Sequence, residues 1–498
     1  MGKVRIRLDP LGKEIAAERG TSLMDVLHEY GVEFPCGGRG TCGKCKVKII
    51  QGEITPDSLH FKRLEEHAWS PEWRLACMSR ADSDLVLEVG QFEVLIQADE
   101  TTFDFKASDG YGVAVDLGTT SLVAQLVELS SARVLAVETA LNPQRRYGSD
   151  LISRLEHALI HGSEYLTSMI RKELGSMISK LLSNRDISLD RVVMVGNTVM
   201  QHLFAGLDIR PLSFYPFESP DLGTRKFTAA ELGWDIDCER IEFYPSIGSF
   251  VGSDILAGIH ATGMWHRQEY SVLVDLGTNG EIVVGNREGL WCASTAAGPA
   301  FEGARISMGM LATTGAISSV EQGAEGITCS VIGNVPASGI CGSGLIDAVS
   351  VLLETGQLGG FGEILSGQPK LSLTGEVVLT QKDIQEFQLA KAAIAAGLFI
   401  LLRKLGLGKE DIADVYIAGA FGNYINLEKM LYTGMMDFPL DRFHKLGNSA
   451  LIGAKMFLFS EGEKADEILA HCHHMNLESE KDFQDIFVDR LSFTQASS

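Results

Sequence analysis

Four cysteines near the start of the chain have the spacing of cluster ligands. Cys36, Cys42 and Cys45 form a C-x5-C-x2-C run in a glycine-rich stretch, and Cys77 follows 32 residues after Cys45. Three thiolates on one tight loop and a distant fourth suit a [2Fe–2S] cluster, in which each of two irons takes two protein ligands. Zinc would favour two paired C-x2-C knuckles. We therefore expect these four cysteines to hold a [2Fe–2S] cluster.

The other cysteines and the histidines suggest no second metal centre. The five remaining cysteines lack ligand spacing and are expected to be small core residues; they are Cys238, Cys292, Cys329, Cys341 and Cys472. The run His-Cys-His-His at 471–474 predicts a histidine-containing surface helix rather than a metal site.

A second chemical signal is a duplicated turn. The segments 113–120 and 272–279 read VAVDLGTT and VLVDLGTN, which agree at six of eight positions. Backbone N–H groups and threonine hydroxyls in such a turn can hold phosphate oxygens, and an aspartate at the strand end can hold hydrated Mg²⁺. We expect two β-hairpins that clamp a polyphosphate from opposite sides. Their candidate residues are Asp116, Gly118, Thr119, Thr120, Ser121, Asp275, Gly277, Thr278 and Asn279.

Three further segments combine a buried strand or small-residue helix with a glycine break. Residues 192–204 predict a strand, a glycine break and a helix start. Residues 415–425 predict a buried strand ending in Gly419, Gly422 and Asn423, where glycine permits close approach of an adenosine. Residues 447–455 predict a helix of small residues that crosses a neighbour tightly. These elements would position the duplicated turns around a nucleotide.

Composition limits the partners of the chain. The 498 residues include 45% hydrophobic and 22% charged residues and carry a net charge of −22. Nucleic acids and anionic membranes are polyanions, so neither is expected to bind. Residues 1–10 lack the apolar core of a signal peptide, and the longest apolar run, 392–402, is too short to span a bilayer. We expect a cytoplasmic protein in which 392–402 is part of a buried helix.

The same features divide the chain into domains. Residues 1–97 contain the four candidate cluster cysteines. They begin with a strand in which Val4, Ile6 and Leu8 alternate with charged residues. Residues 98–111 lack periodicity and predict a linker. Residues 112–498 are expected to form one nucleotide-binding domain with two similar subdomains, approximately 112–268 plus a C-terminal segment, and 269–440.

Two resemblances follow from these motifs. Residues 1–95 have the x5 spacing and the sequence RLAC, which ends in the fourth cysteine. They resemble the plant-type and adrenodoxin-type ferredoxins, which implies a β-grasp fold. Residues 111–460 resemble the superfamily of acetate and sugar kinases, heat-shock chaperones and actin (ASKHA) in motifs and motif order. The implied fold class is a multidomain α/β and α+β protein: a β-grasp ferredoxin domain followed by a duplicated actin-like ATPase fold.

The combination of both units resembles the reductive activators of corrinoid-dependent methyltransferase systems. That resemblance rests on DLGTTS, VGNTVMQHL, DLGTNGE, AAGPAFEGA, ICGSGLIDA and AGAFGNYI. It implies a [2Fe–2S] cluster, ATP and Mg²⁺ as cofactors, with Asp116, Asp275 and Glu281 in catalytic positions. It also implies electron transfer to a Co(II) corrinoid on a partner protein, giving Co(I). The upstream electron donor is not implied, and a homodimer is compatible with the resemblance.

Two questions stay open from the sequence. Residues 292–310 either face the corrinoid, with Ser294 or the GPAFEG turn nearest, or form an interdomain packing loop. The ATPase unit is alternatively a chaperone-like module that remodels a partner while the cluster senses redox state, or a small-molecule kinase. ATPase activity stimulated by a Co(II) corrinoid protein would separate the activator from both.

Overall fold

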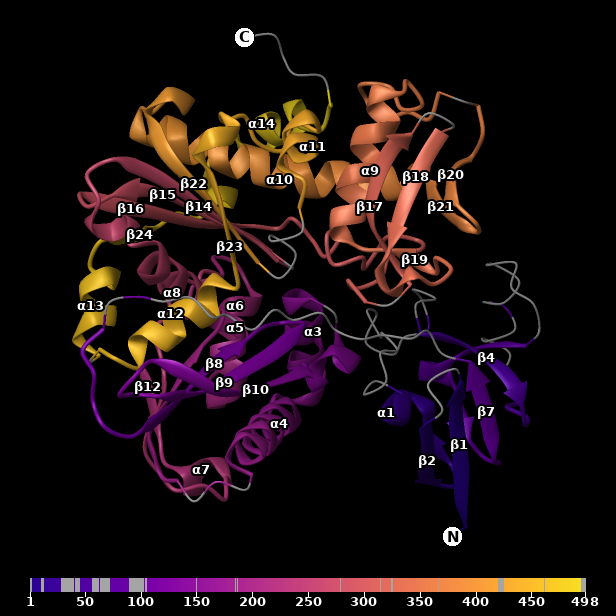
Figure 1. Cartoon of the computed structure of the whole chain (residues 1–498), viewed down its shortest axis with the longest axis horizontal. Helices are drawn as coiled ribbons and strands as arrows, with labels where there is room; N and C mark the ends of the chain where they lie inside the picture. Colours follow the sequence, from indigo (N-terminus) through magenta and orange to yellow (C-terminus); the bar gives the residue numbers. More distant parts are fainter. Residues whose placement is uncertain are drawn as a thin grey trace.

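The chain is described by a computed structural model that covers residues 2–9, 13–27, 40, 45–55, 62, 72–88, 103, 105–148, 150–183, 185, 187–277, 279–313, 315–323, 326–365, 367–419, 425–460 and 462–493. Figure 1 shows a small N-terminal domain beside a larger body made of two lobes.

The N-terminal domain is built on a five-stranded mixed sheet. Strand order is β2-β1-β7-β4-β5, with β1 antiparallel to β2 and parallel to β7. Val4, Ile6 and Leu8 of β1 are buried, as their alternation predicts. This sheet with helix α1 against it is the expected β-grasp fold. Its elements are β1 (Lys3–Asp9), β2 (Lys13–Glu18), β3 (Thr21–Ser22), α1 (Leu23–Leu27), β4 (Lys46–Gln51), β5 (Trp73–Leu75), β6 (Arg80–Ala81) and β7 (Leu85–Glu88).

The larger body contains two six-stranded sheets with the same core topology. Five strands of the first run β10-β9-β8-β11-β13, and five of the second run β16-β15-β14-β22-β23. In each sheet the central strand forms an antiparallel hairpin with the next strand and lies parallel to a later one. The duplicated hairpins expected from the repeat are therefore present, and the duplicated actin-like fold is confirmed.

The strand bounds follow the hydrophobic runs of the sequence. The first sheet consists of β8 (Tyr111–Leu117), β9 (Ser121–Glu128), β10 (Arg133–Leu141), β11 (Leu189–Val195), β12 (Arg225–Phe227) and β13 (Cys238–Phe243). The second consists of β14 (Tyr270–Leu276), β15 (Gly280–Asn286), β16 (Gly289–Thr295), β22 (Ile412–Ala418), β23 (Phe443–Gly447) and β24 (Cys472–His474). A smaller subdomain adds β17 (Ala316–Gly323), β18 (Gly326–Val331), β19 (Gly339–Ile340), β20 (Lys370–Thr374) and β21 (Val377–Thr380).

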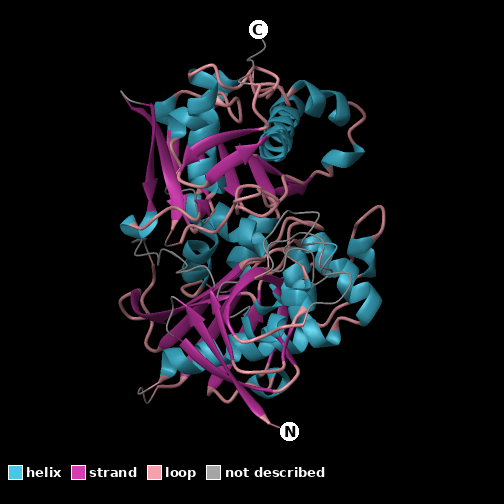
Figure 2. Cartoon of the chain, turned by 90° about the vertical axis from the view of Figure 1, so that its right-hand side faces the viewer, coloured by secondary structure: helices cyan, strands magenta, loops and turns pink. Residues whose placement is uncertain are grey.

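Helices cover the sheets and fill the space between them. The first lobe carries α3 (Leu151–His161), α4 (Glu164–Leu182), α5 (Thr198–Ala205), α6 (Arg210–Ser213), α7 (Ala229–Leu232) and α8 (Ser253–Thr262). Later in the chain come α9 (Gly342–Glu354), α10 (Gln381–Leu405), α11 (Leu427–Tyr432), α12 (Ser449–Phe457), α13 (Glu463–Leu469) and α14 (Phe483–Asp489). Short 3-10 helices include η3 (Pro143–Tyr147), η6 (Lys409–Asp411) and η7 (Leu440–Arg442). Figure 2 shows the strands gathered in an upper and a lower group, with helices and loops between them.

Helices α8 and α12 lie between the two sheets and cross at glycine residues (Figure 1). A Cβ on Gly453 of α12 would lie 2.0 Å from the carbonyl oxygen of Ala257 in α8. A Cβ on Gly258 would lie 3.0 Å from Oγ of Ser449. Larger side chains would force the helices apart, so the expectation of a tight crossing at 447–455 is confirmed.

The longest helix lies in the core. Helix α10 contains the apolar run 392–402 and, alone among helices in the described part of the chain, is long and apolar enough to cross a membrane. However, 78% of its most apolar window is buried inside the protein. This burial is that of a core helix, as the sequence predicts.

The segment before β8 is anchored to the ATPase unit. The rings of Phe103 and Phe105 lie 5.5 Å and 4.7 Å from the ring of Phe459, and the Lys455 ammonium lies over Phe103. Ser108 N–H donates to the carbonyl of Leu129. The 98–111 segment is therefore held against the larger body from Phe103 onward, and β8 already begins at Tyr111.

One local expectation is wrong. Residues 472–474 form the short strand β24, parallel to β16, rather than a surface helix. The sheet edge offers backbone hydrogen bonds to this segment, so tertiary pairing overrides local sequence preference. Among the residues that the structure describes, no three His, Cys, Asp or Glu side chains lie close enough together to bind one metal ion directly. Cys292 and Cys341 are buried core residues, whereas the other three are half-buried: Cys238, Cys329 and Cys472.

Candidate functional site

The first of the two similar turns joins β8 to β9 and is tightly wound. Asp116 lies near the end of β8, and Gly118 N–H donates to the carbonyl of Ser121 at 3.1 Å. A Cβ on Gly118 would lie 2.6 Å from that same carbonyl oxygen. Only glycine therefore fits this position without displacing the turn. We call residues 117–121 the first turn.

Three polar side chains support the first turn from inside the lobe. Asn142 Nδ2 donates to the carbonyl of Gly118 at 2.8 Å, and Asn197 Nδ2 donates to Thr119 Oγ1 at 2.9 Å. The guanidinium of Arg154, which is fully buried, donates to the carbonyls of Thr119 and Gly148. Burial lowers the pKa of Arg154 to about 9. Burying the Arg154 charge directly behind the turn costs desolvation free energy, which its hydrogen bonds to the two carbonyls offset in part.

The second turn joins β14 to β15 and is looser. Asp275 lies near the end of β14, and Gly277 N–H donates to the carbonyl of Asn279 at 3.0 Å. Among the described residues, the nearest atom to a Cβ on Gly277 would be the Asn279 carbonyl oxygen at 3.7 Å. Thr278 lies outside the described residues. We call residues 276–280 the second turn.

Gly419, at the end of β22, lies against the second turn. It has φ +103°, and a Cβ there would lie 2.4 Å from the carbonyl oxygen of Leu276. This position requires glycine because of both its backbone angle and its contact. Gly422 and Asn423, the other residues expected to approach an adenosine, lie outside the described residues.

The fold brings the carboxyl groups of both turns together. Burial raises the pKa of Asp116 to about 6, although a hydrogen bond of 2.7 Å from Asn448 Nδ2 opposes the shift. Burial and the charge of Asp116 raise the pKa of Asp275 to about 7. Crowded carboxylates of this kind are electrostatically unfavourable until a cation joins them. Their oxygen chemistry fits hydrated Mg²⁺.

Two more carboxyl groups complete the cluster. Glu281, at the start of β15, is buried, and its pKa is raised by burial and by the charges of Asp254 and Asp275. Asp254 lies in the first turn of α8, where burial, Asp275 and Asp116 raise its pKa to about 8. The sequence analysis missed Asp254. Its only local signal is an acidic residue at a helix start, which is a common stabilising feature unrelated to catalysis.

The loop 292–310 contacts the first lobe. Ser294 belongs to β16 and pairs with Glu281. Glu302, in the turn that follows, accepts a hydrogen bond of 3.0 Å from Thr120 Oγ1 in the first turn. The GPAFEG turn therefore has the interdomain contact expected of a packing loop.

The described part of the cluster loop is compatible with ligation. Cys45 Sγ and Cys77 Sγ are 3.3 Å apart, which is far longer than a disulfide bond and brings the loop cysteine next to the distant one. Two thiolates this close can serve one iron. Cys36 and Cys42 lie outside the described residues. The soft thiolate pair of Cys45 and Cys77 fits a [2Fe–2S] cluster, in which these two residues would be the ligands of one iron.

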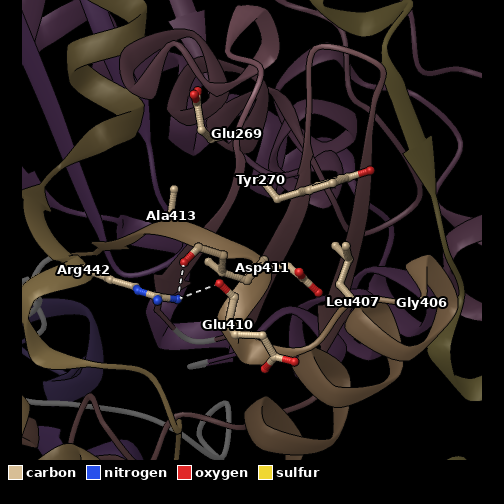
Figure 3. A pocket seen from close by; sticks show the side chains of 9 residues that line it. Glu269, Tyr270, Gly406, Leu407, Glu410, Asp411, Ala413 and Arg442 are labelled. Atoms are coloured by element: carbon tan, nitrogen blue, oxygen red, sulfur yellow. Dashed lines mark hydrogen bonds between the residues drawn. The ribbon is translucent and has the colours of Figure 1, made fainter.

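A separate pocket of about 480 Å³ lies away from this site (Figure 3). It is lined by Tyr270 and Ile412, the first residues of β14 and β22, whereas Asp275 and Gly419 follow at the other ends of these parallel strands. Arg442 donates to the backbone carbonyls of Glu410 and Ile412. This arginine caps the end of a 3-10 helix, and the pocket takes no part in the carboxylate site.

Comparison with known proteins covers the whole architecture. Residues 6–82 match the 2Fe-2S iron-sulfur cluster binding domain. Residues 111–267 match the RACo middle region, and residues 269–498 match the C-terminal domain of RACo, the ASKHA domain. The cluster domain and the ATPase fold expected from the sequence are thus identified independently.

Three full-length relatives are similar over most of the chain. The corrinoid activation enzyme RamQ of Eubacterium limosum is 34% identical over 565 residues, covering 92% of this chain and 94% of the relative. The [Co(II) methylated amine-specific corrinoid protein] reductase of Methanosarcina barkeri is 29% identical, with 77% of each chain covered. A solved reductive activator for corrinoid, iron-sulfur protein has a TM-score of 0.70 and 28% identity, with 98% of each chain covered.

These matches agree with the paired thiolates, the duplicated turns and the order in which the domains follow one another. The expected resemblance is therefore confirmed, and the chain belongs to the RACo family of reductive activators of corrinoid proteins.

Proposed function

We propose that this protein is an ATP-dependent reductive activator of a corrinoid protein. One electron passes from the reduced [2Fe–2S] cluster to the Co(II) corrinoid of the partner, which becomes Co(I). An upstream donor then re-reduces the cluster. The observation that carries the proposal is the presence, in one chain, of a cluster-type thiolate pair and two facing phosphate turns, in the order found in full-length relatives.

Three of these carboxyl groups are assigned to the nucleotide's metal and to water. Asp116 and Asp275 position Mg²⁺ or the attacking water, and Glu281 completes the charge cluster that the metal neutralises. Their raised pKa values mean that metal binding releases protons.

The turns are assigned to the phosphates and the third glycine segment to the adenosine. Backbone N–H groups and hydroxyls of both turns face opposite sides of the phosphates. The phosphate residues are Gly118, Thr119, Thr120, Ser121, Gly277, Thr278 and Asn279, and the adenosine residues are Gly419, Gly422 and Asn423. The four cluster ligands are Cys36, Cys42, Cys45 and Cys77.

ATP is required because the electron moves uphill. Plant-type clusters have potentials near −400 mV, and Co(I) formation needs a lower one. Each 100 mV costs about 2.3 kcal/mol for one electron. Nucleotide binding can supply this free energy if it makes the protein bind one redox state of the partner more tightly than the other.

The proposal is tested with a Co(II) corrinoid protein and a chemical reductant that reduces the cluster. Co(I) formation is followed by its visible spectrum with and without Mg·ATP. The wild-type protein should form Co(I) only with ATP, and the partner should stimulate ATPase activity. Cys77→Ser should abolish reduction and alter the cluster spectrum, yet leave partner-stimulated ATPase.

A matched control is Cys329→Ser, since Cys329 is a half-buried cysteine on β18, in a different domain from Cys45 and Cys77. It should change neither spectrum nor reduction. Reduction by Cys77→Ser at the wild-type rate would rule out the cluster as the donor. Phosphorylation of a small acceptor instead of corrinoid reduction would favour a kinase.

We also propose the organisation and setting of the protein. The chain divides into a cluster domain (1–97), a connecting segment (98–111) and an ATPase unit (112–498) with two subdomains. A cytoplasmic location and the absence of nucleic-acid binding follow from its composition. A homodimer stays a prediction that sedimentation of the purified protein would test.

A further inference from the structure

A hydrogen bond joins the first turn to the loop of the opposite lobe. Thr120 Oγ1 donates to Glu302 Oε2 at 3.0 Å, although the residues are 182 positions apart in the chain. Both side chains are half-buried. The contact links a candidate phosphate ligand to an anionic side chain.

Glu302 is held firmly by its own lobe. Its N–H donates to the carbonyl of Pro299 at 3.2 Å, which closes a turn. The neighbouring Phe301 is 2% exposed and packs edge-on against Phe387 of α10 at 5.7 Å. Further along, Ser307 donates from both N–H and Oγ to the buried carboxylate of Asp383, at the start of α10. The position of Glu302 therefore follows the position of its lobe.

Thr120 is held equally firmly by the first lobe. Its carbonyl accepts a hydrogen bond of 2.9 Å from Asn142 N–H, and the adjoining residue Thr119 is bonded to Asn197 and to Arg154. The bond between Thr120 and Glu302 consequently depends on the separation of the lobes. Small relative displacements of the two lobes make or break it.

The chemistry of this contact conflicts with phosphate binding. A threonine hydroxyl has one proton to donate, so Thr120 cannot donate at once to Glu302 and to a phosphate oxygen. The carboxylate and the phosphates are also both anions and repel each other at short range. Nucleotide and Glu302 therefore compete for the same hydroxyl.

We propose that Glu302 is the positioning residue that couples nucleotide occupancy to the position of residues 296–311, the loop that follows β16. In the nucleotide-free protein it holds Thr120 and keeps the loop against the first lobe. A phosphate oxygen at the first turn accepts the Thr120 hydrogen bond in place of Glu302, and Glu302 moves away together with its loop. By linkage, a partner that draws the loop away strengthens nucleotide binding by the same factor. This inference rests on the proposed function, because it requires Mg·ATP to bind at the turns.

The test is a double-mutant cycle in the full-length protein. Dissociation constants for Mg·ATP are measured by calorimetry for the wild type, Glu302→Gln, Thr120→Val and the double variant. Glu302→Gln removes the charge without changing size and should tighten binding about 5-fold or more. In the Thr120→Val background the same change should have a clearly smaller effect, because only the charge repulsion is then removed. Glu288→Gln, an exposed carboxylate on the same lobe, should bind as the wild type does.

Backbone hydrogen exchange provides a second readout. In the wild type, Mg·ATP should increase exchange within 298–310. In Glu302→Gln, exchange there should already be high without nucleotide. A merely structural role for Glu302 would leave the nucleotide response intact.

The outcomes separate the two proposals. A wild-type protein that does not bind Mg·ATP would refute the proposed function. A wild type that binds while Glu302→Gln is unchanged would refute only the coupling role. Weaker binding by Glu302→Gln would show that Glu302 is a ligand of the nucleotide or its metal, which also overturns the coupling proposal. If Glu302→Gln has an equal effect with and without the Thr120 hydroxyl, then Glu302 affects nucleotide binding only through general charge repulsion, which overturns the coupling proposal.

Discussion

The two turns are nearly identical in sequence but differ in their surroundings. The first turn is supported by Arg154, Asn142 and Asn197, and it is so tight that Gly118 has no room for a Cβ. In the second turn, no atom of the described residues lies closer than 3.7 Å to a Cβ built on Gly277. A repeated motif therefore specifies a repeated hairpin, while the lobe around it decides how rigid that hairpin is.

The difference suggests that the two turns have different functions. A rigid first turn provides a fixed reference for the phosphates, and a looser second turn can adjust as the lobes move. Asp116 is already held by Asn448, at the start of α12, which extends this rigidity to a carboxylate. The following predictions test this contrast.

Loss of either aspartate should have the largest effect. Asp275→Asn and Asp116→Asn keep shape but remove charge needed by the metal, so each should lower ATPase activity about 10²-fold, in line with the loss of one group that stabilises a transition state. The cluster spectrum should be unchanged. The exposed Asp441→Asn is the control. Unaltered turnover in Asp275→Asn would refute the role of the second turn.

Removal of the buried arginine should weaken only the first turn. Arg154→Met leaves the carbonyls of Thr119 and Gly148 without this donor, at about 1–3 kcal/mol each. Urea unfolding of the ATPase unit should shift accordingly, and KM for ATP should rise. Arg171→Met removes a donor to the carbonyl of Phe204, away from the turn. It should reduce stability without raising KM; a raised KM in both variants would mean that general destabilisation is the cause.

Substitution of the two equivalent glycines should give unequal results. Gly118→Ala forces a Cβ to within 2.6 Å of a carbonyl oxygen, whereas the nearest atom at Gly277 is 3.7 Å away. The first change should cost about 1–3 kcal/mol and the second within about 0.5 kcal/mol. Thermal unfolding and ATP affinity measure both. Equal costs would contradict the proposed difference in rigidity.

The smallest expected effect concerns pH. The pKa of Asp275 rises from 3.8 to about 7 in the folded protein, so the folded state binds this proton more tightly than the unfolded state between these values. Stability contributed by the protonated group is present below pH 4 and lost as pH rises through about 7. Without nucleotide and magnesium, Asp275→Asn should therefore raise Tm at pH 8 by about 2 °C and by less at pH 5. A constant difference across this range would contradict the titration.

The sequence predicted the hairpins and the cluster because their signals are local. Asp-Leu-Gly-Thr lies between apolar runs, and three of the four cysteines lie within ten residues of one another. Arg154, Asp254 and Asn448 could not be predicted in this way. Arg154 acts on a carbonyl 35 residues away, and Asn448 acts on a carboxylate 332 residues away. Their roles arise only from tertiary packing, inside the first lobe for Arg154 and between distant segments of the chain for Asn448.

The sequence also could not show where the connecting segment becomes part of the ATPase unit. Residues 98–111 contain Phe103 and Phe105 without periodicity, so no strand or helix is predicted there. Their docking on Phe459 depends on the aromatic partner that follows α12, more than 350 residues later. Tertiary aromatic contacts of this kind leave no local pattern.

The anchoring of Phe103 and Phe105 determines how an electron donor would meet its acceptor. Only 14 residues separate Glu88, the end of β7, from Phe103, so the cluster domain stays within about 50 Å of the anchor whatever path the chain takes. A short tether turns a second encounter into an intramolecular one, with an effective concentration in the millimolar range. The cluster domain then needs no affinity of its own for a docked acceptor. The ion pair between Arg146 and Asp25, at 3.0 Å, also joins the cluster domain to the first lobe, with Asp25 half exposed. The rate of delivery would not depend on protein concentration once the acceptor is bound.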